Sequence, residues 1–259
     1  MKELSWKMRI DLHTHVKISK KTRFDHDYFR QMIREAGANG LHALAITEHF
    51  NTLMFHEIYE TLDREYDYQD DHYICDGVRL FPGMEVDIAE TGHILIIGGR
   101  GDIDAMRSEL DAHAETDSFI PMSKLLDMKD RYDVLTIGAH PYRTSTPLHH
   151  LDWDLLQRLD ALDLNGKDLH AQEATAYRSK LRLFADELGL PIVGGSDTHH
   201  YLQYGCVWNE LAEDCRTVRE LKDIISRGGC EVHVSPCLDT KVKSASIAKE
   251  MLKKEAAIS

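Results

Sequence analysis

The sequence predicts an α/β protein whose strands form a parallel sheet or barrel. Strand-like and helix-like segments alternate from one end of the chain to the other, which is typical of βα units. Seven or eight such strands without a break in composition favour a closed barrel over an open sheet. At 259 residues, an α/β barrel commonly forms one domain. We therefore expect residues 1–259 to be a single domain, with a core at about 8–240 and a helical tail at 241–259.

The predicted strands are short apolar runs, at 8–12, 41–47, 78–86, 93–98, 134–139, 161–164, 190–195 and 231–234. The predicted helices lie between them, at 25–38, 52–68, 104–114, 121–132, 151–159, 171–188 and 217–227. Asp25 is a candidate N-cap, Pro121 suits a first helical turn and Gly189 suits a helix end. The acidic, tyrosine-rich segment 57–76 is predicted to be a solvated helix and loop. The tail 241–259 is predicted to be a basic amphipathic helix that packs on the barrel, mediates association or frays.

Composition excludes several classes of protein. Acidic residues outnumber basic ones, 44 to 31, and the net charge of −13 disfavours a groove for long nucleic acid. It leaves a phosphorylated small molecule possible as a substrate. No apolar run approaches the ~18 residues of a membrane span, and the first residues lack the apolar region of a signal peptide. Five cysteines without a CxxC pair predict free thiols. We expect a cytoplasmic protein without a membrane partner.

The most informative feature is the pair His13 and His15 at the end of the first predicted strand. Residues i and i+2 of a strand point to the same face, so both imidazoles can converge on one metal ion. A single HxH pair is weak evidence for a metal site in a chain with 16 histidines. The pattern recurs, however, because Asp197 and His199 follow the apolar run 191–196 in the same spacing.

Further candidate ligands also lie at the ends of apolar runs. His49, Glu85 and His140 each follow or end a predicted strand, and active sites of barrels collect at the carboxyl ends of the strands. His93 is the exception, because it begins its run and must reach the site from an antiparallel strand or a loop. Taken singly, each residue is more often a surface or core residue than a ligand. Together they supply more nitrogen and oxygen donors than one ion needs, which predicts two or three ions of zinc, manganese or iron.

The ordered motifs DLHTH, ITEH, GMEV, HILIIG, AHPYR, LNG and GSDTHH resemble those of the PHP (polymerase and histidinol phosphatase) superfamily over residues 8–240. The resemblance implies a distorted, TIM-like (β/α)7 barrel with a trinuclear metal site. Carried over by motif, it implies three sets of ligands: His13, His15, Glu85 and Asp197 for one ion, Glu85, His93 and His140 for a second, and His49 and His199 for the third.

Two departures from the family pattern bear on the third ion. Glu48 stands where members often have Asp; since neighbouring strand residues face opposite sides, we expect His49 to be the ligand and Glu48 to support it. Members also often carry a further His or a Ser-Asp after the HxH pair. Here His26 is the only nearby substitute, and a surface histidine at a helix start is the simpler interpretation. The amidohydrolases share the HxH and the closing Asp, but Glu85 and the closing DTH favour PHP.

The resemblance implies a phosphoesterase that hydrolyses a small phosphate monoester, similar to a histidinol-phosphate or nucleotide phosphatase. Arg143 is the candidate phosphate clamp, because a guanidinium binds phosphate bidentately; a surface salt bridge is the alternative. Lys167 is a second candidate cation, and Asn165 a candidate for orienting a ligand. Asp197 or His199 could protonate the leaving group. A PHP nuclease, a phosphotyrosine-protein phosphatase and a non-catalytic metal-stabilised module are the competing hypotheses, and the sequence leaves substrate, metal identity and oligomeric state open.

Overall fold

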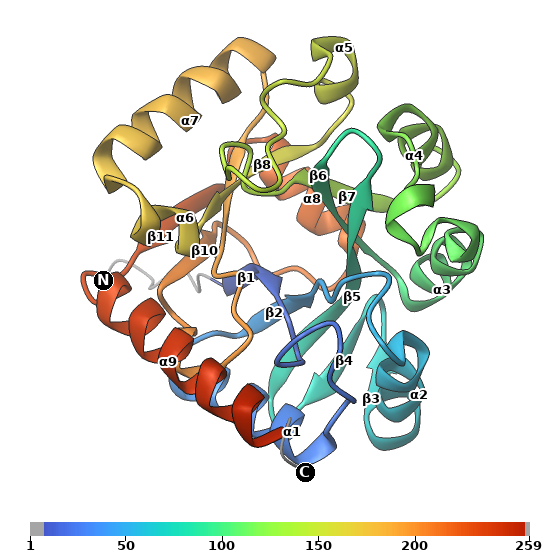
Figure 1. Cartoon of the computed structure of the whole chain (residues 1–259), viewed down its shortest axis with the longest axis vertical. Helices are drawn as coiled ribbons and strands as arrows, with labels where there is room; N and C mark the ends of the chain where they lie inside the picture. The colour runs from blue at the N-terminus through green and yellow to red at the C-terminus, as the bar shows by residue number, and fades with distance from the viewer. Residues whose placement is uncertain (1–7, 257–259) are drawn as a thin grey trace.

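The computed structural model describes residues 8–256, in which strands form a nearly closed barrel surrounded by helices (Figure 1). The strands are β1 (Met8–Thr14), β2 (Ala43–Ile46), β3 (Asp67–Gln69), β4 (His72–Cys75), β5 (Val78–Ile88), β6 (Gly92–Gly98), β7 (Val134–Gly138), β8 (Ala161–Asn165), β9 (Ile192–Gly195), β10 (Val207–Leu211) and β11 (Cys230–Val234). The sheet order is β11-β10-β1-β2-β5-β6-β7-β8-β9, and the β3–β4 hairpin extends from β5. The expected distorted barrel is confirmed.

The helices are α1 (His26–Ala38), α2 (Phe55–Glu65), α3 (Arg100–Glu109), α4 (Met122–Lys129), α5 (Trp153–Leu156), α6 (Gly166–Ala171), α7 (Ala174–Leu188), α8 (Val218–Ser226) and α9 (Leu238–Ala256), with short 3-10 turns η1 (Asp111–His113), η2 (Thr116–Ser118) and η3 (Tyr201–Gln203). Asp25 caps α1 by accepting from the backbone of Tyr28, and Gly189 ends α7 with φ 72°. No helix of residues 8–256 combines the length and the apolar character that crossing a membrane requires.

The strands do not all run in one direction, whereas the βα alternation favoured a parallel sheet or barrel. β1, β2 and β5 are parallel, as are β7, β8 and β9, but β6 is antiparallel to both β5 and β7. Residues 89–91 alone connect β5 to β6, and so short a connection can only return the chain as a hairpin. β10 is likewise antiparallel to β1 and β11.

The barrel closes where β9 meets β1. The backbone of Asp197 donates to the carbonyl of His13 at 2.7 Å, and that of His15 to Thr198 at 2.9 Å. Glycine is required at this seam, because a Cβ on Gly195 would lie 2.3 Å from the Cβ of His13. Asn209 of β10 secures the seam: its side chain accepts from the backbone of β9 at 2.7 Å and donates to carbonyls of β9 and β1 at 2.8 and 3.0 Å.

Two apolar clusters stabilise this arrangement. One packs the outer helices against the barrel and includes Phe29 of α1 and Leu181 of α7. The other joins α8 to side chains on the opposite face of the sheet, such as Leu12, Phe81 and Ile137. Both faces of the barrel strands are therefore covered, as a sheet of this kind requires.

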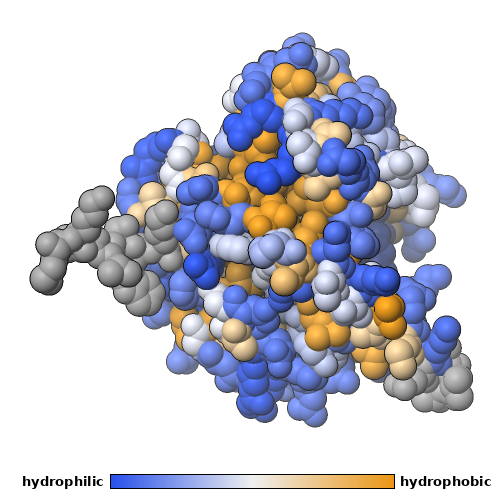
Figure 2. Space-filling view, turned by 90° about the vertical axis from the view of Figure 1, so that its left-hand side faces the viewer, coloured by the Kyte–Doolittle hydropathy of each residue, from blue (hydrophilic) through white to orange (hydrophobic). Residues whose placement is uncertain are grey.

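A hollow of about 840 Å³ lies between α7 and β11, and apolar residues such as Pro191, Ile192 and Val232 line part of it. Figure 2 looks onto this side of the molecule, where hydrophobic residues show between hydrophilic ones. Pro191 and Ile192 stand at the start of β9, whereas Asp197 follows its end. This hollow therefore lies at the opposite end of the strands from the candidate ligands.

The eight predicted strands are present, whereas β3, β4, β10 and the short α6 were not predicted. The segment predicted as a solvated helix and loop contains most of α2 and both strands of the β3–β4 hairpin: β3 is exposed as expected, but β4 is not, because Tyr73 and Cys75 are buried. The tail helix α9 starts earlier than predicted, at Leu238, and packs on the barrel: Val242 and Ala245 are buried, and Lys241 donates to the carbonyl of Tyr204 at 2.8 Å.

Candidate metal centre

His13 and His15 stand at the end of β1 with fully buried side chains. Their Nε2 atoms face the same two carboxylates. His13 Nε2 lies 3.7 Å from Glu85 Oε1 and 3.8 Å from Asp197 Oδ1. His15 Nε2 lies 3.4 Å from Glu85 Oε2 and 3.3 Å from Asp197 Oδ1. The convergence predicted from the HxH spacing is therefore present.

Glu85, near the end of β5, is the centre of the cluster. Its two oxygens lie within 4 Å of five histidine rings: His13 at 3.7 Å, His15 at 3.4 Å, His49 at 3.0 Å, His93 at 2.5 Å and His140 at 3.2 Å. Burial alone would raise the pKa of the Glu85 carboxyl, but the surrounding histidines, His49 and His93 first, hold it well below its ordinary value. The group is therefore a carboxylate surrounded by histidine nitrogens.

His93 reaches the cluster because β6 runs against β5. The register pairs His93 with Asp87, just past Glu85 on β5, so the start of β6 lies at the same end of the barrel as the end of β5. His93 Nδ1 faces Glu85, and its Nε2 lies 3.0 Å from Asp87 Oδ1. The exception noted in the sequence is thus explained by strand direction.

His140 and Asp197 follow β7 and β9 in the left-handed region, with φ of 33° and 56°. Burial, with a smaller contribution from Arg143, lowers the pKa of His140 to about 3, so the imidazole is neutral, as metal ligation requires. Burial would raise the pKa of Asp197, but Lys167, Arg143 and His13 hold it well below its ordinary value. Such non-glycine positive φ values cost energy and occur at functional sites.

His49 and His199 complete the cluster next to His15. The rings of His15 and His199 stack with centroids 4.1 Å apart and an interplanar angle of 7°, and the ring of His49 lies 4.8 Å from that of His15. His199 Nδ1 lies 3.0 Å from the carbonyl of Lys17, which leaves its Nε2 facing Asp197 at 4.0 Å. The backbone carbonyl fixes the tautomer in which Nε2 is the free ligand atom.

The donor set fits a group of metal ions. Several buried nitrogens have no hydrogen-bond partner, namely His13 Nε2, both ring nitrogens of His15 and His49 Nδ1. An unsatisfied buried polar group costs about 1–3 kcal/mol, and coordination would relieve that cost. The donor atoms form three sets, and within each set the atoms lie within 4.8 Å of one another. The sets are His13, His15 and Asp197; His15, His49 and His199; and His49, Glu85 and His93.

This grouping differs from the one implied by the family resemblance in three respects: the set of His13, His15 and Asp197 lacks Glu85, His49 takes the place of His140 beside Glu85 and His93, and His15 joins His49 and His199. The resemblance gave the third ion only His49 and His199, whereas here the second ring of the HxH pair, His15, lies with both. His140 reaches the cluster through Glu85. All eight candidate ligands therefore lie in one buried cluster, with more donors than one ion can use.

Two carboxylates that are not candidate ligands lie near the Nδ1 atoms of His13 and His15. Asp163 Oδ2 lies 2.9 Å from His13 Nδ1 and accepts from the Asn165 amide at 3.0 Å. Glu48 Oε1 lies 3.5 Å from His15 Nδ1, while its Oε2 accepts from the backbone of Val16 and of Lys17 at 3.2 Å. Glu48 therefore supports the site, as expected from its position. Asp163 was not predicted, although it precedes Asn165 by two residues on the same strand and so shares its face.

The two candidate cations both lie against Asp197. Arg143 binds Asp197 Oδ2 and Asp168 Oδ2, each at 2.8 Å, and Asn165 Oδ1 at 3.0 Å. Lys167 Nζ lies 2.8 Å from Asp197 Oδ1. Arg143 thus forms salt bridges inside the site rather than on the surface.

His26 lies outside the cluster. It begins α1, where its Nε2 is 3.2 Å from the hydroxyl of Tyr66. The structure therefore favours the interpretation of His26 as a histidine at the start of a helix rather than as a metal ligand.

A family model described as PHP-associated matches residues 178–230. Among solved structures, PsfC from Pseudomonas syringae PB-5123 is similar, with a TM-score of 0.80 at 20% identity over 95% of this chain and 99% of that one. The lesion-specific endonuclease PfuEndoQ from Pyrococcus furiosus has a TM-score of 0.65 at 19% identity over 88% of this chain. An endonuclease Q in complex with a 27-mer duplex that carries an abasic lesion has a TM-score of 0.66 at 18% identity over 87%. The chain spans 58% of each endonuclease, and no curated protein sequence matches it significantly.

These similarities concern the fold, and the match to the PHP-associated model is confined to residues 178–230. The barrel carries its histidines and carboxylates in the order that the resemblance implied, from His13 near one end of the sequence to His199 near the other. The chain therefore has a barrel similar to those of these structures, a segment that matches the PHP-associated family model, and a buried cluster of histidines and carboxylates that could hold metal ions.

Proposed function

We propose that this protein hydrolyses a small phosphate monoester at a centre of two or three divalent metal ions, zinc, manganese or iron, and that residues 1–259 act as one PHP domain. The observation that carries the proposal is the single buried carboxylate of Glu85 within 4 Å of five histidine rings. A carboxylate so placed is suited to bridging two ions. Bound divalent ions would supply a water of lowered pKa and positive charge for the phosphate oxygens.

The chain's own residues would hold and orient the reacting groups. Asp163 and the carbonyl of Lys17 fix the tautomers of His13 and His199, which directs one nitrogen of each ring into the cluster. Arg143 is the proposed phosphate clamp. Asp168 and Asp197 position its guanidinium at the edge of the site, where one of its donors could turn to a phosphate oxygen.

Of the two candidate proton donors, neither is protonated at neutral pH. The pKa of Asp197 is well below its ordinary value, and burial, with His15 and Lys167 adding to it, holds the pKa of His199 well below its ordinary value as well. Their charge states therefore favour roles as metal ligands over a role as general acid.

The experiment that tests the proposed function measures phosphate release from a panel of substrates by manganese- or zinc-loaded protein. The panel contains histidinol phosphate, nucleoside mono- and bisphosphates, a phosphotyrosine peptide and an activated phosphodiester, and Asp197→Ala serves as the blank. One strongly preferred monoester whose hydrolysis is lost in the variant would support the proposal. Release from the diester alone would transfer the assignment to a nuclease, and no release with metal bound would favour a non-catalytic module.

A further inference from the structure

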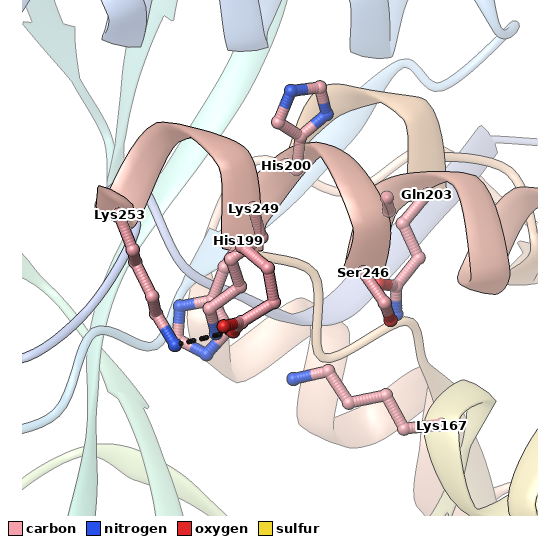
Figure 3. A pocket seen from close by; sticks show the side chains of 9 residues that line it. Lys167, His199, His200, Gln203, Ser246, Lys249 and Lys253 are labelled. Carbon is pink, nitrogen blue, oxygen red and sulfur yellow. Dashed lines mark hydrogen bonds and ion pairs between the residues drawn. The ribbon is translucent and has the colours of Figure 1, made fainter. Parts of the chain in front are cut away.

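A cavity of about 200 Å³ adjoins the metal centre, between α9, α6 and η3. Lys249 and Lys253 line it from α9, Lys167 from α6 and His199 from the loop before η3 (Figure 3). His199 belongs to the cluster of candidate ligands, and Lys167 Nζ lies 2.8 Å from Asp197 Oδ1. The cavity is therefore continuous with the metal centre.

The positions of Lys249 and Lys253 follow from how α9 packs on the barrel. Val242 and Ala245 are buried against the barrel, and Lys241 donates to the carbonyl of Tyr204. Lys249 and Lys253 are four and eight residues beyond Ala245, so they continue the same face of the helix. The docked face thus places both side chains in the lining of the cavity (Figure 3).

The charges in the cavity are not balanced. Lys253 is paired with Glu250 at 3.0 Å and Lys167 with Asp197. Lys249 is half-buried and forms no hydrogen bond or ion pair with the residues that the structure describes. Burial, followed by repulsion from Lys167 and Lys253, lowers the pKa of Lys249 to about 7. A bound anion would favour the charged amine and relieve this repulsion. Three lysines and one glutamate, Glu250, line the cavity, so its lining is net positive in a chain of net charge −13.

We propose that this cavity is a subsite for a second anionic group, a phosphate or a carboxylate, of the substrate whose phosphate ester lies at the metal centre. This inference rests on the proposed function. Lys249 and Lys253 would bind the second group as point charges, which suits a phosphate or carboxylate that approaches in more than one orientation. The substrate class is therefore a small phosphate monoester with two separated anionic groups, rather than one with a neutral remainder.

The test compares three substrates with the same primary alkoxide leaving group: butyl phosphate, 1,4-butanediol bisphosphate and 4-(phosphonooxy)butanoate. The measured quantity is the ratio of the KM for butyl phosphate to the KM for each of the two substrates that carry a second anionic group. The variant is Lys249→Gln with Lys253→Gln. The matched control is Lys243→Gln with Lys254→Gln, which removes the same charge from exposed positions of the same helix.

We expect the wild-type KM to be at least about tenfold lower for a substrate with a second anionic group than for butyl phosphate, since a hydrogen bond to a charged group contributes about that factor. The Lys249 and Lys253 variant should bring the ratio towards one, and the control should keep it. Preference for the bisphosphate or for the carboxylate identifies the second group. Equal KM values in the wild type, or equal losses in variant and control, would overturn the subsite.

Failure of the subsite can be told apart from failure of the proposed function. If metal-loaded protein hydrolyses neither these three compounds nor any monoester of the substrate panel, the proposed function fails. Calorimetric binding of 1,4-butanediol bisphosphate then tests the subsite alone. Binding that weakens by about tenfold in the Lys249 and Lys253 variant, with helical content unchanged by circular dichroism, supports it, and equal affinity overturns it.

Discussion

Asp163 is predicted to determine how tightly the centre binds metal, although it is not one of the candidate ligands. Its Oδ2 lies 2.9 Å from His13 Nδ1, and both side chains are buried. The contact places the ring proton on Nδ1, so that the lone pair of Nε2 faces Glu85 and Asp197. Asp163→Asn removes the negative charge but retains an oxygen that can accept from the ring, whereas Asp163→Ala removes both.

The size of the effect follows from the loss of one buried, charge-assisted contact behind a ligand. Such partners typically change metal affinity by about 10- to 100-fold, or about 1.4–2.8 kcal/mol. We expect a loss of about tenfold for Asp163→Asn and about 100-fold for Asp163→Ala. The assay is a titration of metal-free protein with zinc or manganese in competition with a chromophoric chelator.

The control for this experiment is Asp186→Asn, an exposed position on α7 that removes the same charge. Circular dichroism would establish that each variant is folded. If folded Asp163→Ala bound metal as tightly as the wild type and the control, Asp163 would have no part in orienting His13, and the reasoning from its contact would be refuted.

Three further changes have defined outcomes. Arg143→Ala should raise the KM for a phosphomonoester by about tenfold or more, while elemental analysis shows little loss of metal; unchanged kinetics would remove Arg143 from the site. Asn209→Ala should lower the free energy of unfolding by about 3 kcal/mol, since three hydrogen bonds across the seam are lost. Calorimetry should then show a Tm lower by roughly 6–12 °C, and an unchanged Tm would contradict the role of Asn209 in closure. In metal-free protein, burial alone would lower the pKa of His13 and of His93, but neighbouring carboxylates raise these pKa values to about 10 and about 9. The protonated rings of His13 and His93 therefore contribute fully to the free energy of unfolding below about pH 6.5, and this contribution is lost as the pH rises through 9 to 10. Urea unfolding should show a free energy of unfolding that falls from pH 7 to pH 10; a rise would contradict this expectation.

The candidate ligands could be predicted from the sequence because each stands beside a strong strand signal. Two i, i+2 pairs follow apolar runs, namely His13 with His15 and Asp197 with His199, and both members of each pair lie in the cluster of the folded chain. His93 could be named but not placed, because its position depends on the direction of β6. That direction follows from the three-residue connection after β5, a feature of length rather than of residue type.

The residues that sequence reasoning missed are those whose role depends on distant contacts. Asp163 supports a histidine 150 positions away, and nothing in its neighbourhood distinguishes it from a strand residue with a polar partner. β10 is a short strand whose alternating pattern is weak, and its assignment needs its pairing with β1 and β11. Lys249 is one of several lysines in the tail. Only the packing of α9 on the barrel, which places Lys249 in the lining of the cavity, distinguishes it from its exposed neighbours.

The metal content of the protein tests the multinuclear centre most directly. The measurement is elemental analysis of protein that has been saturated with zinc, manganese or iron, freed of unbound metal and quantified by amino-acid analysis. With eight candidate ligands in one buried cluster and Glu85 placed between the histidines, we predict at least two divalent ions per chain. One ion per chain or fewer would contradict a bridging role for Glu85 and, with it, the proposed centre.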